Sequence, residues 1–173
     1  MVTMNYHSCL QVEAYLRQDR FLMFSLPQDC LDLLRLHVER SYPKEGCGIL
    51  LGSREDGCEL VRRVIPTPNA ASEPEHRFVI APEALIAAQK MAREQGLQIV
   101  GFFHSHPDRT AEPSDLDLRQ AEWTGCIYLV CAVLRGELIA ISGARLIERR
   151  RWEAVLVEPA YQCNDLHCVP AAD

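Results

Sequence analysis

The sequence predicts a single α/β domain in which a mixed central β-sheet is flanked by helices. Three observations lead to this fold class. The chain has 173 residues, a length that fits one ordinary domain with a substantial core. Hydrophobic residues make up 48% of it and charged residues 24%, which is typical of globular proteins. Apolar runs of strand length alternate with segments of helical period, as they do where helices pack on a sheet.

The first helix is predicted to begin at Ser25, with this serine as the N-cap and Pro27 in the first turn. Apolar residues then recur at helical spacing as far as Val38. The helix is expected to end at Tyr42-Pro43, because the residue before a proline disfavours helical backbone.

Three short strands and a second helix are predicted next. The strands are expected at residues 48–52, 58–65 and 77–80, with a polar turn between the first two. A helix follows from Ala81 to about Gln95, and Gly96 is placed to cap its C-terminus.

The second half of the chain again alternates between strand and helix. Residues 97–103 predict a strand that is apolar enough to be central in a sheet. Residues 114–123 predict a short helix. Three more strands, joined by glycine-containing turns, are predicted at residues 127–134, 138–142 and 144–157.

The two ends of the chain differ from this patterned middle. We expect residues 1–23 to be an extension outside the domain, residues 24–158 to form the domain, and residues 159–173 to be a tail. The N-terminal segment lacks the unbroken apolar stretch of an export signal. The longest apolar run, residues 126–134, is too short to span a membrane. These features predict a soluble cytoplasmic protein without a membrane partner.

Eight cysteines are spread along the chain and form no Cys-x-x-Cys pair. Neither a zinc ribbon nor a thioredoxin-type site is therefore predicted. Cys126 and Cys131 lie in an apolar run and are expected to be small buried side chains. In the cytoplasm all eight thiols are expected to be reduced.

The net charge of −6 argues against a nucleic-acid partner, which would normally face a basic stripe. Basic residues cluster once, at residues 149–151. We interpret this cluster as a solvated face, with a patch for phosphate or an acidic partner as the alternative.

Two histidines at the end of the predicted 97–103 strand are the first candidate metal ligands. Residues two apart in a strand point to the same face, so His104 and His106 can address one ion while Ser105 faces away. Pro107 ends the strand because it has no N–H to donate. A His-x-His pair also occurs often by chance, so the pair alone does not define a site.

A second polar pair follows at the start of the next predicted helix. Ser114 and Asp117 are three residues apart, which places them on one face. Ser-x-x-Asp is by itself typical of helix capping, a role compatible with metal binding. Two imidazoles and one carboxylate would leave the fourth position of a tetrahedral zinc open for water, as in catalytic sites. Spacing alone leaves other carboxylates of this loop open as ligands: Asp108, Glu112 and Asp115.

The order His-x-His-Pro, six residues, then Ser-x-x-Asp resembles the signature of the JAMM metallopeptidases, also called the MPN-plus family. All four positions are filled in this sequence, by His104, His106, Ser114 and Asp117. The family also has a glutamate at the edge of an early strand, and Glu45 before Gly46-Cys47-Gly48 is similar in position. The resemblance covers about residues 25–157. It implies the layered α/β fold that JAMM/MPN domains share with cytidine deaminases.

The resemblance also implies the roles of these residues. His104, His106 and Asp117 would hold one Zn²⁺ per chain, and Glu45 would be the base that activates a zinc-bound water. Zinc lowers the pKa of bound water to about 7, and a carboxylate within reach can take the proton and deliver it to the leaving amine. Ser114 would hydrogen-bond the tetrahedral intermediate and stabilise its oxyanion.

By resemblance, the chain is expected to be a zinc-dependent peptidase or isopeptidase that cleaves at the C-terminal tail of a ubiquitin-like protein. We expect it to be too short to hold the insertions of larger eukaryotic members, and it resembles the compact prokaryotic members, which act on ubiquitin-like sulfur-carrier proteins. Members of the family grip an extended tail beside an exposed strand, which is β-strand addition.

Two other functions compete with this interpretation. A non-catalytic MPN scaffold or protein-binding module would lack the metal ligands, and the ligand set is complete here. A zinc deaminase would need His-x-Glu or Cys-x-Glu with a Pro-Cys-x-x-Cys element, which is missing. An exposed edge strand or the apolar segment 127–134 could also support a homodimer.

Other chemically active residues are weaker candidates. His37 lies at core spacing on the first helix and is interpreted as structural. His76 precedes the predicted 77–80 strand and could line a substrate groove. Cys163, His167 and Cys168 could bind a second metal, but a fourth ligand is not evident and a loosely packed tail is favoured.

Overall fold

Eight strands and three helices make up the computed structural model, which describes residues 23–55, 58–148 and 151–160. The strands are β1 (Met23–Pro27), β2 (Cys47–Glu55), β3 (Cys58–Thr67), β4 (Gln98–Pro107), β5 (Ile127–Leu134), β6 (Glu137–Glu148), β7 (Arg151–Val155) and β8 (Val157–Ala160). The helices are α2 (Gln28–Ser41), α3 (Pro82–Glu94) and α4 (Asp115–Gln120). All eight strands join in one sheet of order β7-β6-β5-β4-β2-β3-β1-β8. The sheet is mixed, because β1 pairs in parallel with β3 and β8, and β4 pairs in parallel with β5, whereas the other neighbours are antiparallel.

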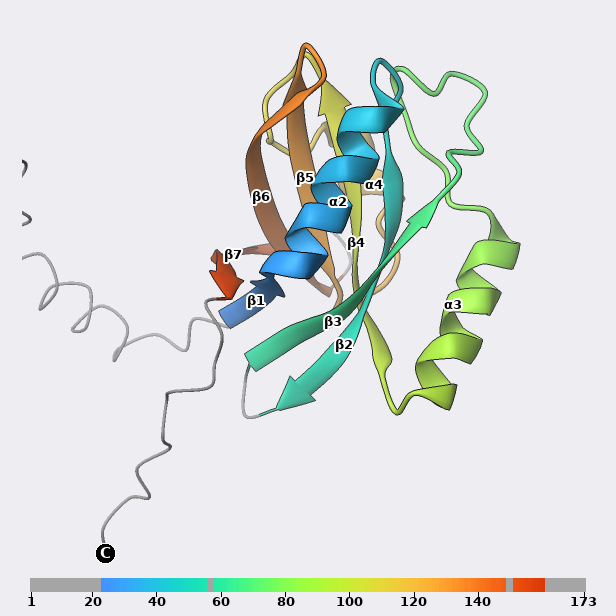
Figure 1. Ribbon diagram of the computed structural model, residues 1–173, viewed down its shortest axis with the longest axis vertical. Helices are drawn as coiled ribbons and strands as arrows, with labels where there is room; N and C mark the ends of the chain where they lie inside the picture. The colour runs from blue at the N-terminus through green and yellow to red at the C-terminus, as the bar shows by residue number, and fades with distance from the viewer. Residues whose placement is uncertain (1–22, 56–57, 149–150, 161–173) are drawn as a thin grey trace, which may run out of the picture.

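Helices α2 and α3 cover opposite faces of this sheet. The alternation along β2 shows why, since Leu50 packs in one core cluster with Leu34 of α2, whereas Ile49 and Leu51 pack in the other with Ala88 of α3. Figure 1 shows α2 lying across the sheet, well separated from α3. The predicted α/β class, with a mixed central sheet flanked by helices, is therefore confirmed.

The two ends of the sheet are brought back toward each other by the chain. Strands β7 and β8 stand at opposite ends of the strand order, yet only Leu156 lies between them in sequence. The sheet must therefore curl until β8 approaches β6. A glycine permits this approach, because a Cβ at Gly143 would lie only 2.8 Å from Cγ2 of Val157.

Strand β4 is central, as predicted, and lies between β5 and β2. It continues to Pro107, so that both histidines belong to the strand itself rather than to the loop after it. From Val100 to His106 every residue of β4 is buried. The metal-ligand candidates therefore stand on one of the best-anchored strands of the fold.

Some predicted elements were wrong for reasons that lie in tertiary structure. Ser25 does not cap a helix but belongs to β1, where it pairs with Leu60 and Glu158, and α2 begins only at Gln28. Residues 77–80 are not a strand. The Val79 backbone instead donates to the side chain of Asn69 and accepts from the N–H of Ala70, so this segment pairs with its own loop.

The C-terminal strands also differ from their predicted bounds. Residues 138–148, which were predicted as two strands, belong to the continuous strand β6, and β7 and β8 follow it. Strand β5 is buried between β4 and β6, so the apolar segment 127–134 is not an edge strand.

Among the described cysteines none forms a disulfide, and Cys126 and Cys131 are buried as predicted. No helix in the described part of the chain is long and apolar enough to cross a membrane. Most of the predicted N-terminal extension and C-terminal tail lies outside the described residues, as do Cys163, His167 and Cys168.

Candidate metal centre

Two buried imidazoles meet on one face of β4. His104 and His106 are each 2% exposed, and their Nε2 atoms lie 3.1 Å apart. Strand alternation turns the side chain between them the other way, and the Ser105 hydroxyl accepts a hydrogen bond from the N–H of Gly46 at 2.8 Å. The strand thus presents two nitrogen donors to one point.

Asp117 reaches the same point from α4. Its Oδ1 lies 3.4 Å from Nε2 of His104 and its Oδ2 lies 3.2 Å from Nε2 of His106. A capping box holds this carboxylate in place: the Asp117 side chain accepts from the N–H of Ser114 at 2.7 Å, and the Ser114 hydroxyl accepts from the N–H of Asp117 at 3.2 Å. The first turn of the helix therefore fixes where the carboxylate lies.

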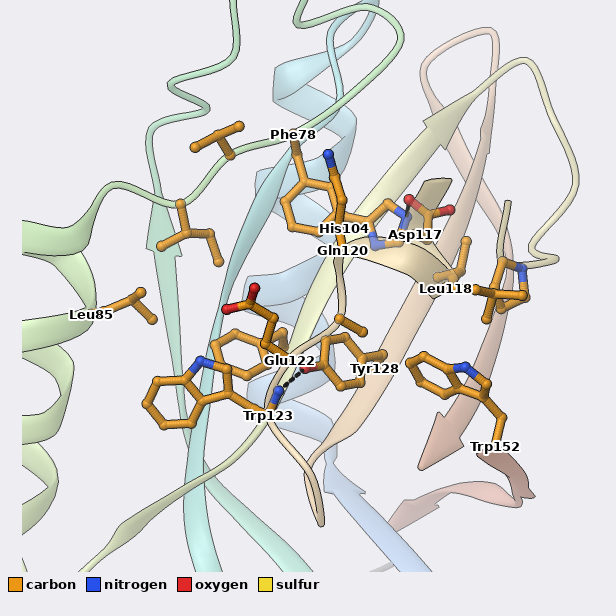
Figure 2. A pocket seen from close by; sticks show the side chains of 16 residues that line it. Phe78, Leu85, His104, Asp117, Leu118, Gln120, Glu122, Trp123, Tyr128 and Trp152 are labelled. Atoms are coloured by element: carbon orange, nitrogen blue, oxygen red, sulfur yellow. Dashed lines mark hydrogen bonds and ion pairs between the residues drawn. The ribbon is translucent and has the colours of Figure 1, made fainter. Parts of the chain in front are cut away.

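The orientation of each imidazole is also fixed. Nδ1 of His106 donates to the carbonyl of Thr110 at 2.9 Å, which leaves the Nε2 lone pair for a metal. The ring of His104 stacks on Phe78, with 4.4 Å between ring centroids and 19° between planes. Figure 2 shows Phe78 and His104 side by side, with Asp117 next to the imidazole.

The protonation states suit a cation. Burial lowers the pKa of His104, although its contacts with Asp117 act in the opposite sense. Burial acts to raise the pKa of Asp117, but the hydrogen-bonding contacts with His104 and His106 outweigh burial and hold this pKa well below its usual range. A neutral imidazole beside an ionised carboxylate is the state in which both groups bind a metal.

The donor set fits zinc. One ligand atom from each of His104, His106 and Asp117 lies within 4.8 Å of the others, and no other such group of histidine, cysteine and acidic residues occurs in the described ranges. Two nitrogens and one carboxylate oxygen are ligands that zinc accepts, and three protein ligands leave one tetrahedral position open. The competing carboxylates lie elsewhere. Asp108 binds Tyr42 and the backbone of Arg135, while Glu112 and Asp115 are exposed.

Glu45 lies just before β2, in the segment that runs beside the histidines. Strand pairing places Cys47 opposite His104, and Ser105 donates its N–H to the carbonyl of Gly46. The same antiparallel register continued by one residue brings Glu45 level with His106. The carboxyl group is 2% exposed, and burial raises its pKa to about 7 although Arg109 acts in the opposite sense.

A pocket of about 360 Å³ opens on one side of the centre. Its wall includes His104 and Asp117 but is mainly apolar, with five aromatic side chains: Phe78, Phe102, Trp123, Tyr128 and Trp152. Figure 2 shows His104 and Asp117 at one end of this pocket and Trp123 and Tyr128 at the other. His76, which was a weak candidate for a groove, is exposed and not part of the wall.

His37 has contacts of the kind expected for a structural residue. Its Nε2 lies 3.0 Å from the carbonyl of Cys47, and its ring packs edge-on against Phe103. It is therefore part of the support beneath β2 and β4 rather than of the histidine pair.

Sequence reasoning missed two side chains of the site. Arg109 contacts the Glu45 carboxylate, and Phe78 covers His104. An arginine inside the loop between the two ligand pairs was a signal, but its partner lies 64 residues earlier in the chain. The residues next to Arg109 in the sequence give no sign that its side chain contacts Glu45.

The fold and the convergent donor set define an α/β domain with a candidate metal site between its central strand β4 and helix α4. Within that class the chain belongs to the family of prokaryotic homologs of the JAB domain, whose sequence model matches residues 27–154. This match confirms the JAMM/MPN resemblance that the spacing of the histidines, serine and aspartate predicted.

Similar proteins come from bacteria and archaea. The chain is 38% identical over 102 residues to a probable TtuB-protein conjugate cleaving protease of Thermus thermophilus, a match that covers 59% of this chain and just under two thirds (66%) of that protein. It is 32% identical over 112 residues to a desampylase of Haloferax volcanii, covering 62% of this chain and 79% of the relative. A solution structure of a Desulfitobacterium hafniense protein matches with a TM-score of 0.69 and 28% identity, covering 84% of this chain and 99% of that one.

Proposed function

We propose that the protein is a zinc-dependent peptidase or isopeptidase that hydrolyses the bond at the C-terminal tail of a ubiquitin-like protein of the sulfur-carrier type. One observation carries the proposal: donor atoms of His104, His106 and Asp117 converge, and the buried Glu45 lies in the segment whose backbone pairs with the histidine-bearing strand β4. The names of the Thermus and Haloferax relatives, a conjugate-cleaving protease and a desampylase, support the substrate class.

The proposed chemistry divides between the metal and the residues around it. Zinc, held by His104, His106 and Asp117, would supply Lewis-acid activation of water and of the scissile carbonyl. Glu45 would take the proton of the attacking water through its carboxylate and then deliver it to the leaving amine. A side chain with a pKa near neutrality suits both steps, because it can accept and release a proton at physiological pH.

Ser114 is proposed to stabilise the carbonyl oxygen as it becomes negative. Its oxygen accepts from the backbone N–H of Asp117, and the hydroxyl proton can still be donated to a substrate. The capping box also fixes the serine relative to Asp117. A pre-positioned donor of this kind stabilises an oxyanion without reorganising during the reaction.

The aromatic pocket supports an approach of the tail from the side of His104 and Asp117. Its volume of about 360 Å³ is within the range of small-ligand sites and is large enough for side chains of an extended peptide. Val79 and Ile80 in its wall belong to the segment that was predicted as a strand. The tail is proposed to lie against the side chains of this segment, because the Val79 backbone is already hydrogen-bonded within its own loop.

The test is Glu45→Gln in zinc-loaded protein. Turnover of a TtuB–lysine conjugate by the wild type is expected to stop on chelation. The variant is expected to lose activity by on the order of 10²–10⁴-fold because the general base is gone. Metal analysis should still find stoichiometric zinc in the variant, since Glu45 is not proposed as a ligand.

The alternatives give different results. Loss of zinc in Glu45→Gln would make this residue a ligand or a structural element. A wild-type protein that holds zinc but cleaves neither the lysine-linked conjugate nor a fusion through an ordinary peptide bond would contradict the proposed function and favour a binding module.

A further inference from the structure

The loop between β4 and α4 carries Arg109 and is anchored on both sides of it. Asp108 accepts from the Tyr42 hydroxyl and from the backbone N–H of Arg135, each at 2.9 Å. The carbonyl of Thr110 accepts from His106, and that of Ala111 accepts from the Ser142 hydroxyl. The path of the loop is therefore set without any contribution from the Arg109 guanidinium.

The backbone of Glu45 is likewise held without Arg109. Its N–H donates to the carbonyl of Pro74 at 2.7 Å, and its carbonyl accepts from Nδ2 of Asn69 at 3.0 Å. The next residue, Gly46, makes two hydrogen bonds to Ser105. Its carbonyl accepts from the Ser105 N–H, and its N–H donates to the Ser105 hydroxyl. These bonds fix the Cα of Glu45 but do not fix the rotation of its carboxylate.

The Arg109 guanidinium holds the Glu45 carboxylate, whose rotation the backbone hydrogen bonds leave free. Its NH2 group donates to Oε1 of Glu45, and it makes the one ion pair to this carboxylate among the described residues. The glutamate side chain is 2% exposed, whereas the arginine side chain is 42% exposed. An arginine stays protonated at any physiological pH and binds a carboxylate oxygen in a directed way.

We infer that Arg109 is a positioning residue for hydrolysis: by holding Oε1 it turns Oε2 of Glu45 toward the centre formed by His104, His106 and Asp117. The inference rests on the proposed function, because it acts through the proposed base. Arg109 itself touches neither the histidines nor Asp117 by any hydrogen bond or ion pair found in the described residues. Its effect should therefore appear in the rate of the chemical step rather than in metal binding.

The test compares zinc-loaded Arg109→Ala with Arg119→Ala. Arg119 is a matched control, because it is exposed on α4 and outside the contact with Glu45. With the TtuB–lysine conjugate as probe, Arg109→Ala is expected to lower kcat by about tenfold or more, with KM nearly unchanged and zinc still stoichiometric. The control should match the wild type.

Three further measurements separate positioning from a structural role. Millimolar guanidinium should restore part of the activity of Arg109→Ala and leave the wild type unchanged. Arg109→Lys should keep more activity than the alanine variant, because it retains the charge but not the planar fork. In crystals of metal-free protein, the Glu45 carboxylate should be turned or disordered in Arg109→Ala and unchanged in Arg119→Ala.

The outcomes distinguish a failure of the Arg109 inference from a failure of the proposed function. If Glu45→Gln is inactive but Arg109→Ala has the kcat of the wild type, the role of Arg109 is overturned and the proposed function stands. A rise in KM at constant kcat, or an unmoved Glu45 carboxylate, also overturns it. If the wild type shows no metal-dependent cleavage, the proposed function falls and this inference falls with it.

Discussion

Asp117 rather than its neighbours faces the histidines because of where α4 begins. The capping box turns the Asp117 carboxylate back over the first turn, where it meets both Nε2 atoms. Asp115 is the first residue of the same helix and is exposed. The two positions differ by about 200° around the helix axis, so only one of the two side chains can point at β4.

Replacing Asp117 by alanine is therefore expected to strip the metal. The variant loses the only carboxylate in the described ligand group and leaves two imidazoles that cannot by themselves complete a stable zinc site. Metal analysis after gel filtration is the measurement, with Asp115→Ala as the matched control that should keep its zinc. Zinc retained in Asp117→Ala and lost in Asp115→Ala would identify Asp115 as the third ligand instead.

The side chains of the site could be predicted from the sequence to different degrees. His104 and His106 share a strand, and Ser114 and Asp117 share a helical turn, so local periodicity brings each pair together. Glu45 could be placed only by family resemblance, because its position depends on how β2 pairs with β4. Arg109 escaped prediction because its contact is made across the fold.

Strand β4 and helix α4 together form one wall of the aromatic pocket. Phe102 and His104 come from β4, and Asp117 and Leu118 come from α4. The two elements are joined by the anchored loop, so the pocket and the candidate metal centre share one support. An apolar wall beside the ligands provides a place where an extended substrate can gain binding energy.

A charge placed in this wall should weaken substrate binding without stopping chemistry. Leu118→Asp is expected to raise KM for the TtuB–lysine conjugate on the order of tenfold, because burial of an apolar side chain of this size is worth about 1.5–3 kcal/mol. The value of kcat should change little. Steady-state kinetics tests this, with Leu36→Asp, an exposed position on α2 outside the pocket, as control. Equal effects of the two variants would show that the pocket does not hold substrate.

The curled sheet separates two apolar cores and also buries several polar side chains of the site. One core lies between the sheet and α2, and a second lies between the opposite face and α3. Glu45, His104 and His106 are polar groups that are buried in this frame. Their burial carries a cost in folding free energy unless each group is paired, so the site affects the stability of the whole molecule.

The stability of the metal-free protein should depend on pH through Glu45. Its pKa is raised from 4.5 to about 7 by burial, so the folded state binds the proton more tightly than the unfolded state. The resulting stabilisation is fully present below pH 4.5 and is lost as pH rises through 7. Between about pH 8 and about pH 5 the wild type should therefore gain on the order of 2 kcal/mol relative to Glu45→Gln.

Urea unfolding in the presence of a chelator measures this difference. The comparison with Glu45→Gln cancels contributions from other groups, including His104, whose lowered pKa acts in the opposite direction. A difference in unfolding free energy that does not vary with pH would show that Glu45 ionises normally in the folded protein.

Local sequence pattern is enough to predict the α/β class, the strand whose end carries His104 and His106, the helix start that carries Ser114 and Asp117, and the family. These features depend on local period and spacing, which the order of residues contains. Tertiary structure decided that Ser25 belongs to a strand, that β7 and β8 are brought back around the sheet, and that Arg109 meets Glu45. Such contacts depend on which strands pair and how the sheet curls, and residues far apart in the chain carry no local signal of that pairing.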